Sequence, residues 1–159
     1  MSNERVDKIN YYLDIAETVS ERGTCLRKNY GCIIVKNDEI VGKGHNEVLK
    51  NNDPTCHGEI MAIHEACKTL NTFDLTGCEV YTTGEPCPMC LAAILWANIE
   101  KVYYGCNIFD TEKIGFRDNK FYKFQNNPSQ RQKMIKELDR DQCLKLYDLY
   151  NSLTDKKQY

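Results

Sequence analysis

The chain has 159 residues, of which 42% are hydrophobic and 28% charged, and its formal net charge is −2 at pH 7. This length suits one domain over residues 1–159, and the sequence shows no signal peptide and no apolar run of membrane-spanning length. An isoelectric point near 5.9 gives no overall basic surface for nucleic acid. Nine cysteines without an export signal indicate a reducing, cytoplasmic compartment. We therefore expect a soluble cytoplasmic protein whose partner is a small molecule rather than a membrane or a nucleic acid.

The first part of the chain predicts a helix followed by a β-hairpin. Apolar residues recur at helical spacing over residues 4–21, and Gly23 follows as a helix stop. Residues 32–35 form a short apolar strand, residues 37–38 a turn and residues 39–45 a second strand.

Helices and strands alternate after this hairpin. A loop at residues 51–54 leads to a helix over 58–70, a strand over 79–83, a helix over 88–97 and a strand over 102–104. This order predicts an α/β domain with three layers, α/β/α, and a mixed sheet with an antiparallel hairpin edge and parallel later strands. A helical tail starts at about residue 128. Its apolar residues could cap a pocket, mediate dimerisation or simply pack: Ile135, Leu138, Leu146, Tyr147, Tyr150 and Leu153.

Two short motifs supply metal-binding residues. His-Gly-Glu at residues 57–59 is followed, after one strand, by Pro-Cys-Pro-Met-Cys at residues 86–90. One imidazole and two thiols suit zinc, and three protein ligands leave the fourth position open for water, as in catalytic sites. Zinc lowers the pKa of bound water to about 7–9. We expect one Zn²⁺ per chain on His57, Cys87 and Cys90, with Glu59 as the catalytic proton carrier.

Two other interpretations of these residues remain open. A Cys-x-x-Cys pair in a cytosolic α/β protein can be a thioredoxin-like redox pair, but that would leave His57 and Glu59 unexplained. A structural zinc site usually needs four protein ligands, which would require Cys25 or Cys32 to be brought in by the fold. The catalytic interpretation also fits the expected location, because ligands in such sheets bind where strands end and helices begin. A helix N-terminus at Cys87 and Cys90 would favour thiolate.

Several segments resemble the cytidine deaminase superfamily, and within it the small bacterial guanine deaminases. The resemblance is carried by residues 51–59 and 81–97, and more thinly by residues 115–118 and the closing residues 156–159. It implies a five-stranded sheet between helices and the zinc-dependent hydrolytic deamination of a free base or nucleoside, with guanine giving xanthine and ammonia. It also implies a homodimer, with C-terminal tails exchanged between its subunits.

The resemblance further implies residues that contact the substrate. Asn46 matches an asparagine that binds the base edge, and Tyr30 an aromatic residue that stacks on the ring. Trp96 matches a wall of the pocket, whereas Asp118 and Tyr159 match late residues that close over a purine. Asn46 could instead end a strand, Trp96 could belong to the core and Tyr159 could be a frayed terminus.

Departures from the guanine deaminase pattern keep other substrates open. Gly58 stands where guanine deaminases usually have alanine and fungal cytosine deaminases have glycine, so we expect a substrate pocket larger by one methyl group. Residues 23–28 resemble deoxycytidylate deaminases, which leaves a cytosine- or cytidine-type deaminase as the alternative. A transfer RNA adenosine deaminase would need a basic surface, and the late helix mixes both signs of charge. A non-catalytic zinc or redox module would release no ammonia.

Overall fold

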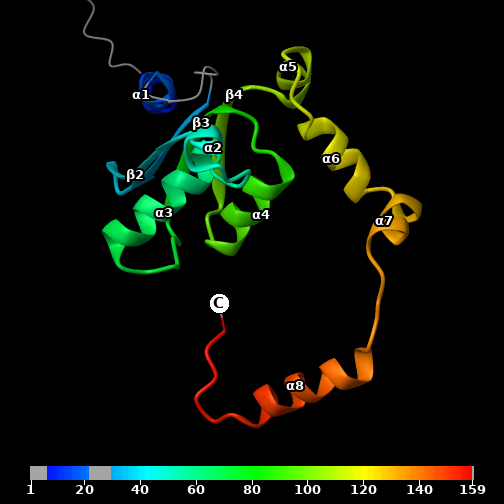
Figure 1. Ribbon diagram of the computed structural model, residues 1–159. Helices are drawn as coiled ribbons and strands as arrows, with labels where there is room; N and C mark the ends of the chain where they lie inside the picture. The colour runs from blue at the N-terminus through cyan, green and yellow to red at the C-terminus, as the bar shows by residue number, and fades with distance from the viewer. Residues whose placement is uncertain (1–6, 22–29, 159) are drawn as a thin grey trace, which may run out of the picture. The chain divides into compact units, whose positions relative to one another are not determined.

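The computed structural model describes residues 7–21 and 30–158 (Figure 1). The chain forms two compact units, residues 1–121 and residues 122–159. All the strands in the described part of the chain belong to the first unit, and the described elements of the second are helices. No described helix has the length and apolarity needed to cross a membrane.

The described strands form one mixed sheet in the order β2-β1-β3-β4. They are β1 (Gly31–Lys36), β2 (Glu39–His45), β3 (Cys78–Gly84) and β4 (Lys101–Cys106). β1 pairs antiparallel with both β2 and β3, and β3 pairs parallel with β4. The predicted hairpin and the parallel later strands are therefore confirmed. The fifth strand implied by the resemblance is not formed by the described residues, because the chain after β4 is helical.

The hairpin turn has a local cause. Asn37 and Asp38 both have positive φ, 49° and 64°. Two consecutive residues with positive φ match the right-handed twist of the two strands, and Asn and Asp tolerate this conformation better than most residues. The turn sets the pairing of β1 with β2, although the register shifts at Ile34 and Val35.

Helices cover both faces of the sheet, which confirms the three-layer architecture (Figure 1). On one face, α1 (Lys8–Ser20) packs Tyr12 and Ala16 against Ile33, Val35 and Tyr81. The other face carries α3 (Gly58–Leu70) and α4 (Pro88–Trp96). Their core residues there are Ala62, Ala66 and Ile94, packed with Cys32, Ile34 and Val80. Successive β1 side chains alternate between the two cores, which explains why residues 32–35 are continuously apolar.

The helix α3 lies against β2 with little side chain between them. A Cβ added at Gly44 would come within 2.1 Å of the Gly58 carbonyl oxygen, and one at Gly42 within 2.4 Å of the Ala62 carbonyl oxygen. The helical spacing of Ile60, Ile63, Cys67 and Leu70 predicts that larger side chains fill this face of α3. The fully buried residues are instead Gly58, Glu59, Ala62 and Ala66, because the strand glycines admit the helix backbone; Ile60, Ile63, Cys67 and Leu70 are only partly buried.

Most predicted element bounds agree with the structure. The first helix was expected over residues 4–21, and its described part is α1, preceded by Asp7; residues 4–6 and Gly23 lie outside the described residues. One short helix, α2 (Val48–Asn51), was not predicted. It lies between β2 and the expected loop at residues 51–54, and only its last residue, Asn51, falls within that loop.

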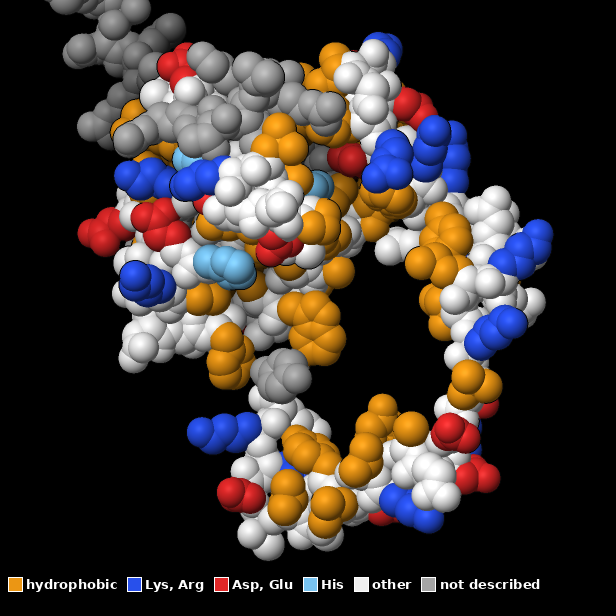
Figure 2. Space-filling model, viewed as in Figure 1, with side chains coloured by type: hydrophobic (Ala, Val, Ile, Leu, Met, Phe, Trp, Pro, Cys, Tyr) orange, Lys and Arg blue, Asp and Glu red, His pale blue; other side chains and the backbone are white. Residues whose placement is uncertain are grey.

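The chain after β4 continues through four helices among the described residues: α5 (Ile108–Lys113), α6 (Asp118–Gln125), α7 (Pro128–Met134) and α8 (Arg140–Ser152). α5 has a capping box between Asn107 and Asp110. The second unit begins at Tyr122, within α6, six residues before the expected start of the tail. In α7 and α8 no residue is buried, and hydrophobic side chains lie on their surface (Figure 2).

Candidate active site

Both metal-binding motifs lie at the start of a helix. His57 is the residue before α3, and Cys87 is the residue before α4. Pro88 occupies the first turn of α4, where its missing N–H removes no helical hydrogen bond, and it fixes a backbone angle that suits the helix. Cys90 follows within the same turn and is fully buried. The sequence therefore places the three side chains at two helix N-termini, which the fold brings together.

The three candidate ligand atoms have the spacing that zinc requires. The Nδ1 atom of His57 lies 3.6 Å from the Sγ atom of Cys87 and 3.5 Å from that of Cys90. Zinc bonds of about 2.0–2.1 Å to nitrogen and about 2.3 Å to sulfur, at a tetrahedral angle, separate the two atoms by about 3.5–3.6 Å. Among the described residues, these three ligand atoms all lie within 4.8 Å of one another. The donor set fits one zinc ion with its fourth position open.

The two thiols have opposite pKa shifts. A hydrogen bond from the Cys90 thiol lowers the pKa of Cys87, and His57 contributes in the same direction. The same pairing with Cys87 and burial together raise the pKa of Cys90. The hydrogen bond to Cys87 raises the pKa of His57. The site thus favours negative charge on Cys87, as a metal-binding thiolate requires.

Glu59 lies next to the candidate ligands. It is 5% exposed, and its Oε2 atom accepts a hydrogen bond from the Cys90 thiol over 3.5 Å. Burial raises the pKa of this carboxyl group above its ordinary value. A buried carboxyl group beside the candidate metal ligands is suited to carry protons.

A pocket opens over these groups. It is lined by Tyr30, Asn46, His57, Glu59, Glu85, Cys87, Phe116 and Asp118. Its empty volume is about 350 Å³ with the open mouth included. Five segments contribute these residues: the residue before β1, the residue after β2, the start of α3, the connection from β3 to α4, and the connection from α5 into α6.

Three of the substrate-contact residues expected from the resemblance line this pocket. Asn46 follows β2; its N–H donates to the Tyr30 carbonyl oxygen at 3.3 Å, and its side-chain Oδ1 accepts from the Val48 N–H at 3.2 Å. Tyr30 is partly buried and meets Phe116 edge to face, with ring centroids 5.3 Å apart. Burial raises the pKa of Asp118, the first residue of α6.

Two lining residues were not singled out from the sequence. Phe116 lies beside Gly115, which has a φ of 94°. Glu85 follows β3, and its Oε2 accepts a hydrogen bond from the Ile108 N–H at 2.7 Å. Both residues stand inside the segments that resemble the deaminase family, residues 81–97 and 115–118. That position in the sequence was the signal by which they could have been recognised as pocket residues. Their place at the pocket depends on how the chain returns after β4, which no local pattern encodes.

Two expected contacts do not line the pocket in the described part of the chain, and a third lies outside that part. Trp96 is 64% exposed at the far end of α4, about 9 Å along the helix from Cys90, and does not line the pocket. Gly58 does not line it either. A Cβ there would face the Tyr30 and Gly44 carbonyl oxygens at 3.3 and 3.4 Å, so the missing methyl leaves room for backbone packing and does not enlarge the pocket. Tyr159 lies outside the described residues.

A three-layer α/β fold with this donor set and a buried carboxylic acid defines a zinc-dependent hydrolytic enzyme. Residues 6–106 match the model of the cytidine and deoxycytidylate deaminase zinc-binding region. The chain belongs to this family, and its reaction is a zinc-dependent hydrolytic deamination.

Known relatives and solved structures agree with this assignment. The chain is 37% identical to the guanine deaminase of Bacillus subtilis over 131 residues, which is 82% of this chain and 84% of that protein. The X-ray structure of guanine deaminase from B. subtilis matches with a TM-score of 0.85 at 33% identity, covering 97% of this chain and 99% of that one. The tRNA-specific adenosine deaminase of Aquifex aeolicus is 54% identical over 75 residues, 47% of this chain and 50% of that protein.

Proposed function

We propose that the protein converts guanine to xanthine and ammonia in nucleobase metabolism, as a step of purine salvage in the cytoplasm. The observation that carries this proposal is the extent of the similarity. The match to the guanine deaminase structure covers 97% of the chain and therefore includes the segment after β4 that supplies Phe116 and Asp118 to the pocket. The match to the transfer RNA enzyme of A. aeolicus, although higher in identity, covers only 47% of the chain.

We assign the residues of the pocket as follows. His57, Cys87 and Cys90 hold the zinc ion, which when bound supplies an activated water for attack on the ring carbon that bears the amino group. Asn46 binds the edge of the base. Tyr30 stacks on its ring, and Phe116 packs against Tyr30 at the edge of the pocket. Asp118, a partly buried acceptor, faces the polar edge of a purine. Each assignment is supported by the position of the residue around the pocket.

Glu59 moves the protons in this mechanism. It accepts a proton from the attacking water and delivers it to a ring nitrogen, while the water oxygen bonds to the ring carbon and makes it tetrahedral. The second proton, taken by Glu59 from the new hydroxyl group, passes to the amino group, so the C–N bond breaks and ammonia leaves as the C–O bond becomes a carbonyl. The burial of the carboxyl group beside the candidate zinc ligands supports this role.

A substrate panel tests the choice of base. Guanine, cytosine, adenine, their nucleosides and a transfer RNA anticodon stem-loop should be compared by ammonia release, with Glu59→Gln as the inactive control. We expect kcat/KM for guanine to exceed that for every other substrate by at least about tenfold, or about 1.4 kcal/mol. A preference for cytosine, cytidine or the stem-loop would reject guanine as the substrate while leaving the deaminase assignment unchanged.

We also propose that the enzyme is a homodimer, that its C-terminal tail from about residue 128 follows one deaminase domain, and that the tails are exchanged between subunits. The exposed face of α4 supports the dimer. This helix carries no charged residue, yet Leu95 and Trp96 are each 64% exposed. A helix that is apolar all round is normally covered.

Sedimentation of Leu95→Glu tests the dimer. A buried carboxylate at a subunit contact costs several kcal/mol, so we expect the variant to sediment as a monomer where the wild type sediments as a dimer. Leu49→Glu is a matched control, since Leu49 is 66% exposed on α2. A wild-type monomer, or a Leu95→Glu dimer, would contradict the proposal.

A further inference from the structure

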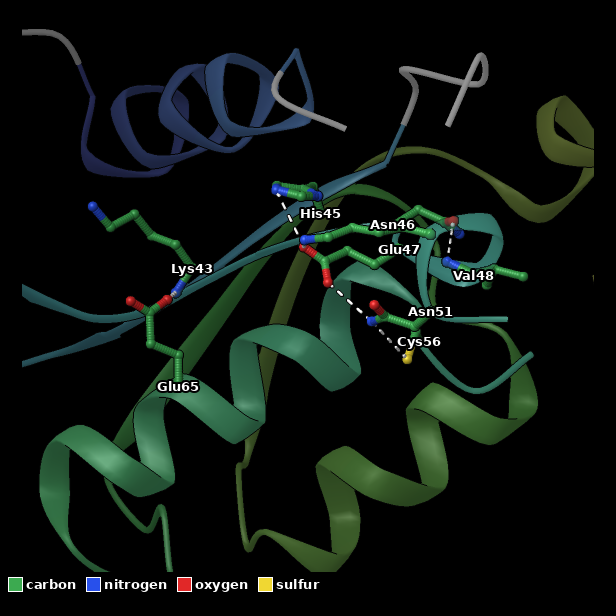
Figure 3. Close-up of polar contacts among 9 residues, drawn as sticks. Lys43, His45, Asn46, Glu47, Val48, Asn51, Cys56 and Glu65 are labelled. Atoms are coloured by element: carbon green, nitrogen blue, oxygen red, sulfur yellow. Dashed lines mark hydrogen bonds and ion pairs between the residues drawn. The ribbon is translucent and has the colours of Figure 1, made fainter. Parts of the chain in front are cut away.

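The carboxylate of Glu47 joins several groups beside the pocket (Figure 3). Its side chain is 14% exposed. The Oε1 atom accepts a hydrogen bond from the Lys50 ammonium at 3.0 Å, and the Nε2 atom of His45 lies 3.7 Å from the same oxygen. The Oε2 atom accepts a hydrogen bond from the Asn51 side-chain amide at 3.0 Å. One carboxylate thus links the end of β2 to the last turn of the short helix α2.

The same residue is tied to the segment that carries a zinc ligand. The N–H of Glu47 donates to the carbonyl oxygen of Cys56 at 2.9 Å, and the amide nitrogen of Asn51 lies 3.5 Å from the Cys56 sulfur. Cys56 is buried and immediately precedes His57. The hydrogen bond between Glu47 and Cys56 therefore closes residues 47–56 into a loop. The Asn51 side chain lies within this loop and contacts both the Glu47 carboxylate and the Cys56 sulfur.

This loop holds the substrate-side asparagine. Asn46 precedes Glu47 in the chain, and its side-chain Oδ1 accepts from the N–H of Val48, the first residue of α2. The position of the Asn46 amide thus depends on where α2 begins. The Glu47 carboxylate fixes α2 through Lys50 and Asn51, which lie in the last turn of that helix. A four-residue helix has little stability of its own and needs such contacts.

We propose that Glu47 is a positioning residue that sets the affinity of the enzyme for its base by holding Asn46 in place relative to His57. This inference rests on the proposed function only in that Asn46 contacts the substrate. Lys50 and Asn51 supply the partners that a largely buried carboxylate requires, so the ionised form persists at neutral pH. Hydrogen bonding from Lys50 lowers the pKa of Glu47, in agreement with this arrangement.

Steady-state kinetics of Glu47→Ala test the proposal against a matched carboxylate. Glu65 also accepts a hydrogen bond beside β2, from the Lys43 N–H at 2.6 Å, but it is exposed and far along α3 from the pocket (Figure 3). We expect Glu47→Ala to raise KM at least about fivefold with kcat changed less than about twofold. Zinc should stay at one per chain, and Glu65→Ala should leave KM unchanged.

Two further variants show whether the effect passes through Asn46. Glu47→Gln keeps one oxygen acceptor for Asn51 but loses the charge that binds Lys50, so its KM should fall between wild type and Glu47→Ala. In an Asn46→Ala background, Glu47→Ala should change KM less than about twofold, because the group it positions is gone.

Three outcomes would overturn the inference. These are a KM for Glu47→Ala equal to that of Glu65→Ala, an equal effect of Glu47→Ala in both backgrounds, or a loss of zinc that accounts for the change. If Glu47→Ala does not fold, Glu47→Gln alone supplies the KM comparison. KM is measured on the base that the wild type deaminates best, so failure of the guanine assignment is seen in the wild type and leaves the test of Glu47 intact.

Discussion

His57 and Cys87 each occupy the position just before a helix, and this position determines their electrostatics. The first turn of a helix presents N–H groups and a partial positive charge, which favours a thiolate at Cys87. Glu59 lies in the first turn of α3 as well, where the same charge would favour its ionised form. Its complete burial acts in the opposite direction and raises its pKa. One environment thus supplies an anionic ligand and a carboxyl group suited to proton transfer.

Removing one ligand should remove the metal. Purified protein should contain about one zinc per chain, and His57→Ala, Cys87→Ala and Cys90→Ala should each lose it, because two ligands bind zinc far more weakly than three. Elemental analysis after dialysis measures the content. Cys143→Ala, a change of an exposed cysteine in α8, should keep full occupancy. Full zinc in Cys87→Ala would show that the ligand assignment is wrong.

Glu59→Gln should separate zinc binding from turnover. Glutamine has nearly the same size but cannot transfer the proton, so we expect zinc and fold to be retained and kcat to fall by about 10²–10⁴-fold or more. Ammonia release and elemental analysis on one preparation check both statements. Glu65→Gln changes an exposed carboxylate on the same helix and should be neutral. Near-normal turnover in Glu59→Gln would exclude it as the proton carrier.

The sequence predicted the local part of the site better than the long-range part. His57, Glu59, Cys87 and Cys90 stand within two short motifs, and the structure brings them together because each motif starts a helix. Asn46, Tyr30 and Asp118 were named only by resemblance, and they line the pocket. Phe116 and Glu85 were missed and Trp96 was misplaced, since their positions depend on how elements distant in sequence pack.

At the scale of elements, the contact between α3 and β2 determines how the site is supported. The strand presents Gly42 and Gly44 to the helix, and the helix presents Gly58, Ala62 and Ala66. The hydrophobic pattern predicted both elements and their order. It did not predict that the contacting face would be made of small residues, because periodicity favours large apolar side chains as the buried ones. A pairing of small residues is visible only when both elements are known to touch.

Alanine at two glycines should therefore have different effects. The added methyl of Gly44→Ala meets backbone atoms at 2.1 and 2.4 Å, which cannot move aside, so we expect a loss of at least about 1–3 kcal/mol in the free energy of unfolding. Gly58→Ala meets its neighbours at 3.3 Å or more and should cost less. Thermal and urea unfolding measure both.

Gly58→Ala also tests the pocket geometry. Its methyl group would face the backbone of Tyr30, Gly44 and His45, and Gly58 does not line the pocket, so the ratio of kcat/KM for guanine to that for cytosine should change less than about threefold. A larger change in this ratio would contradict our interpretation and support the expectation that Gly58 enlarges the substrate pocket.

At the scale of the whole molecule, the chain combines a compact unit that contains the pocket with a second unit whose apolar side chains are exposed. Met134, Leu138 and Tyr147 are 76%, 79% and 69% exposed. Such residues are normally covered in a folded protein, and a tail exchanged between two subunits would cover them. Near the end of the sequence, the Tyr150 hydroxyl donates to the Lys157 carbonyl oxygen at 3.0 Å. This hydrogen bond holds the backbone of Lys157 against α8.

Deleting residues 156–159 tests whether the tail reaches an active site. We expect purine deamination to fall more than about tenfold, or about 1.4 kcal/mol of transition-state stabilisation, with zinc content and Tm nearly unchanged. Tyr159→Ala should reproduce the loss, and Lys156→Ala should not. Full activity in the truncated enzyme would exclude a capping role for Tyr159 and favour a cytosine- or nucleoside-type substrate.

The glycine contact beneath α3 also restricts how the enzyme moves. Helices that pack through long side chains can slide by small amounts as those side chains repack. Between Gly44 and Gly58 there is main chain on both sides, so the start of α3 and the end of β2 move as one body. Among the described lining residues, Phe116 and Asp118 lie in the segment after β4, outside this contact, so we expect an opening that admits a base to involve that segment. His57 and Glu59, at the start of α3, should then stay in place relative to β2 while the base exchanges.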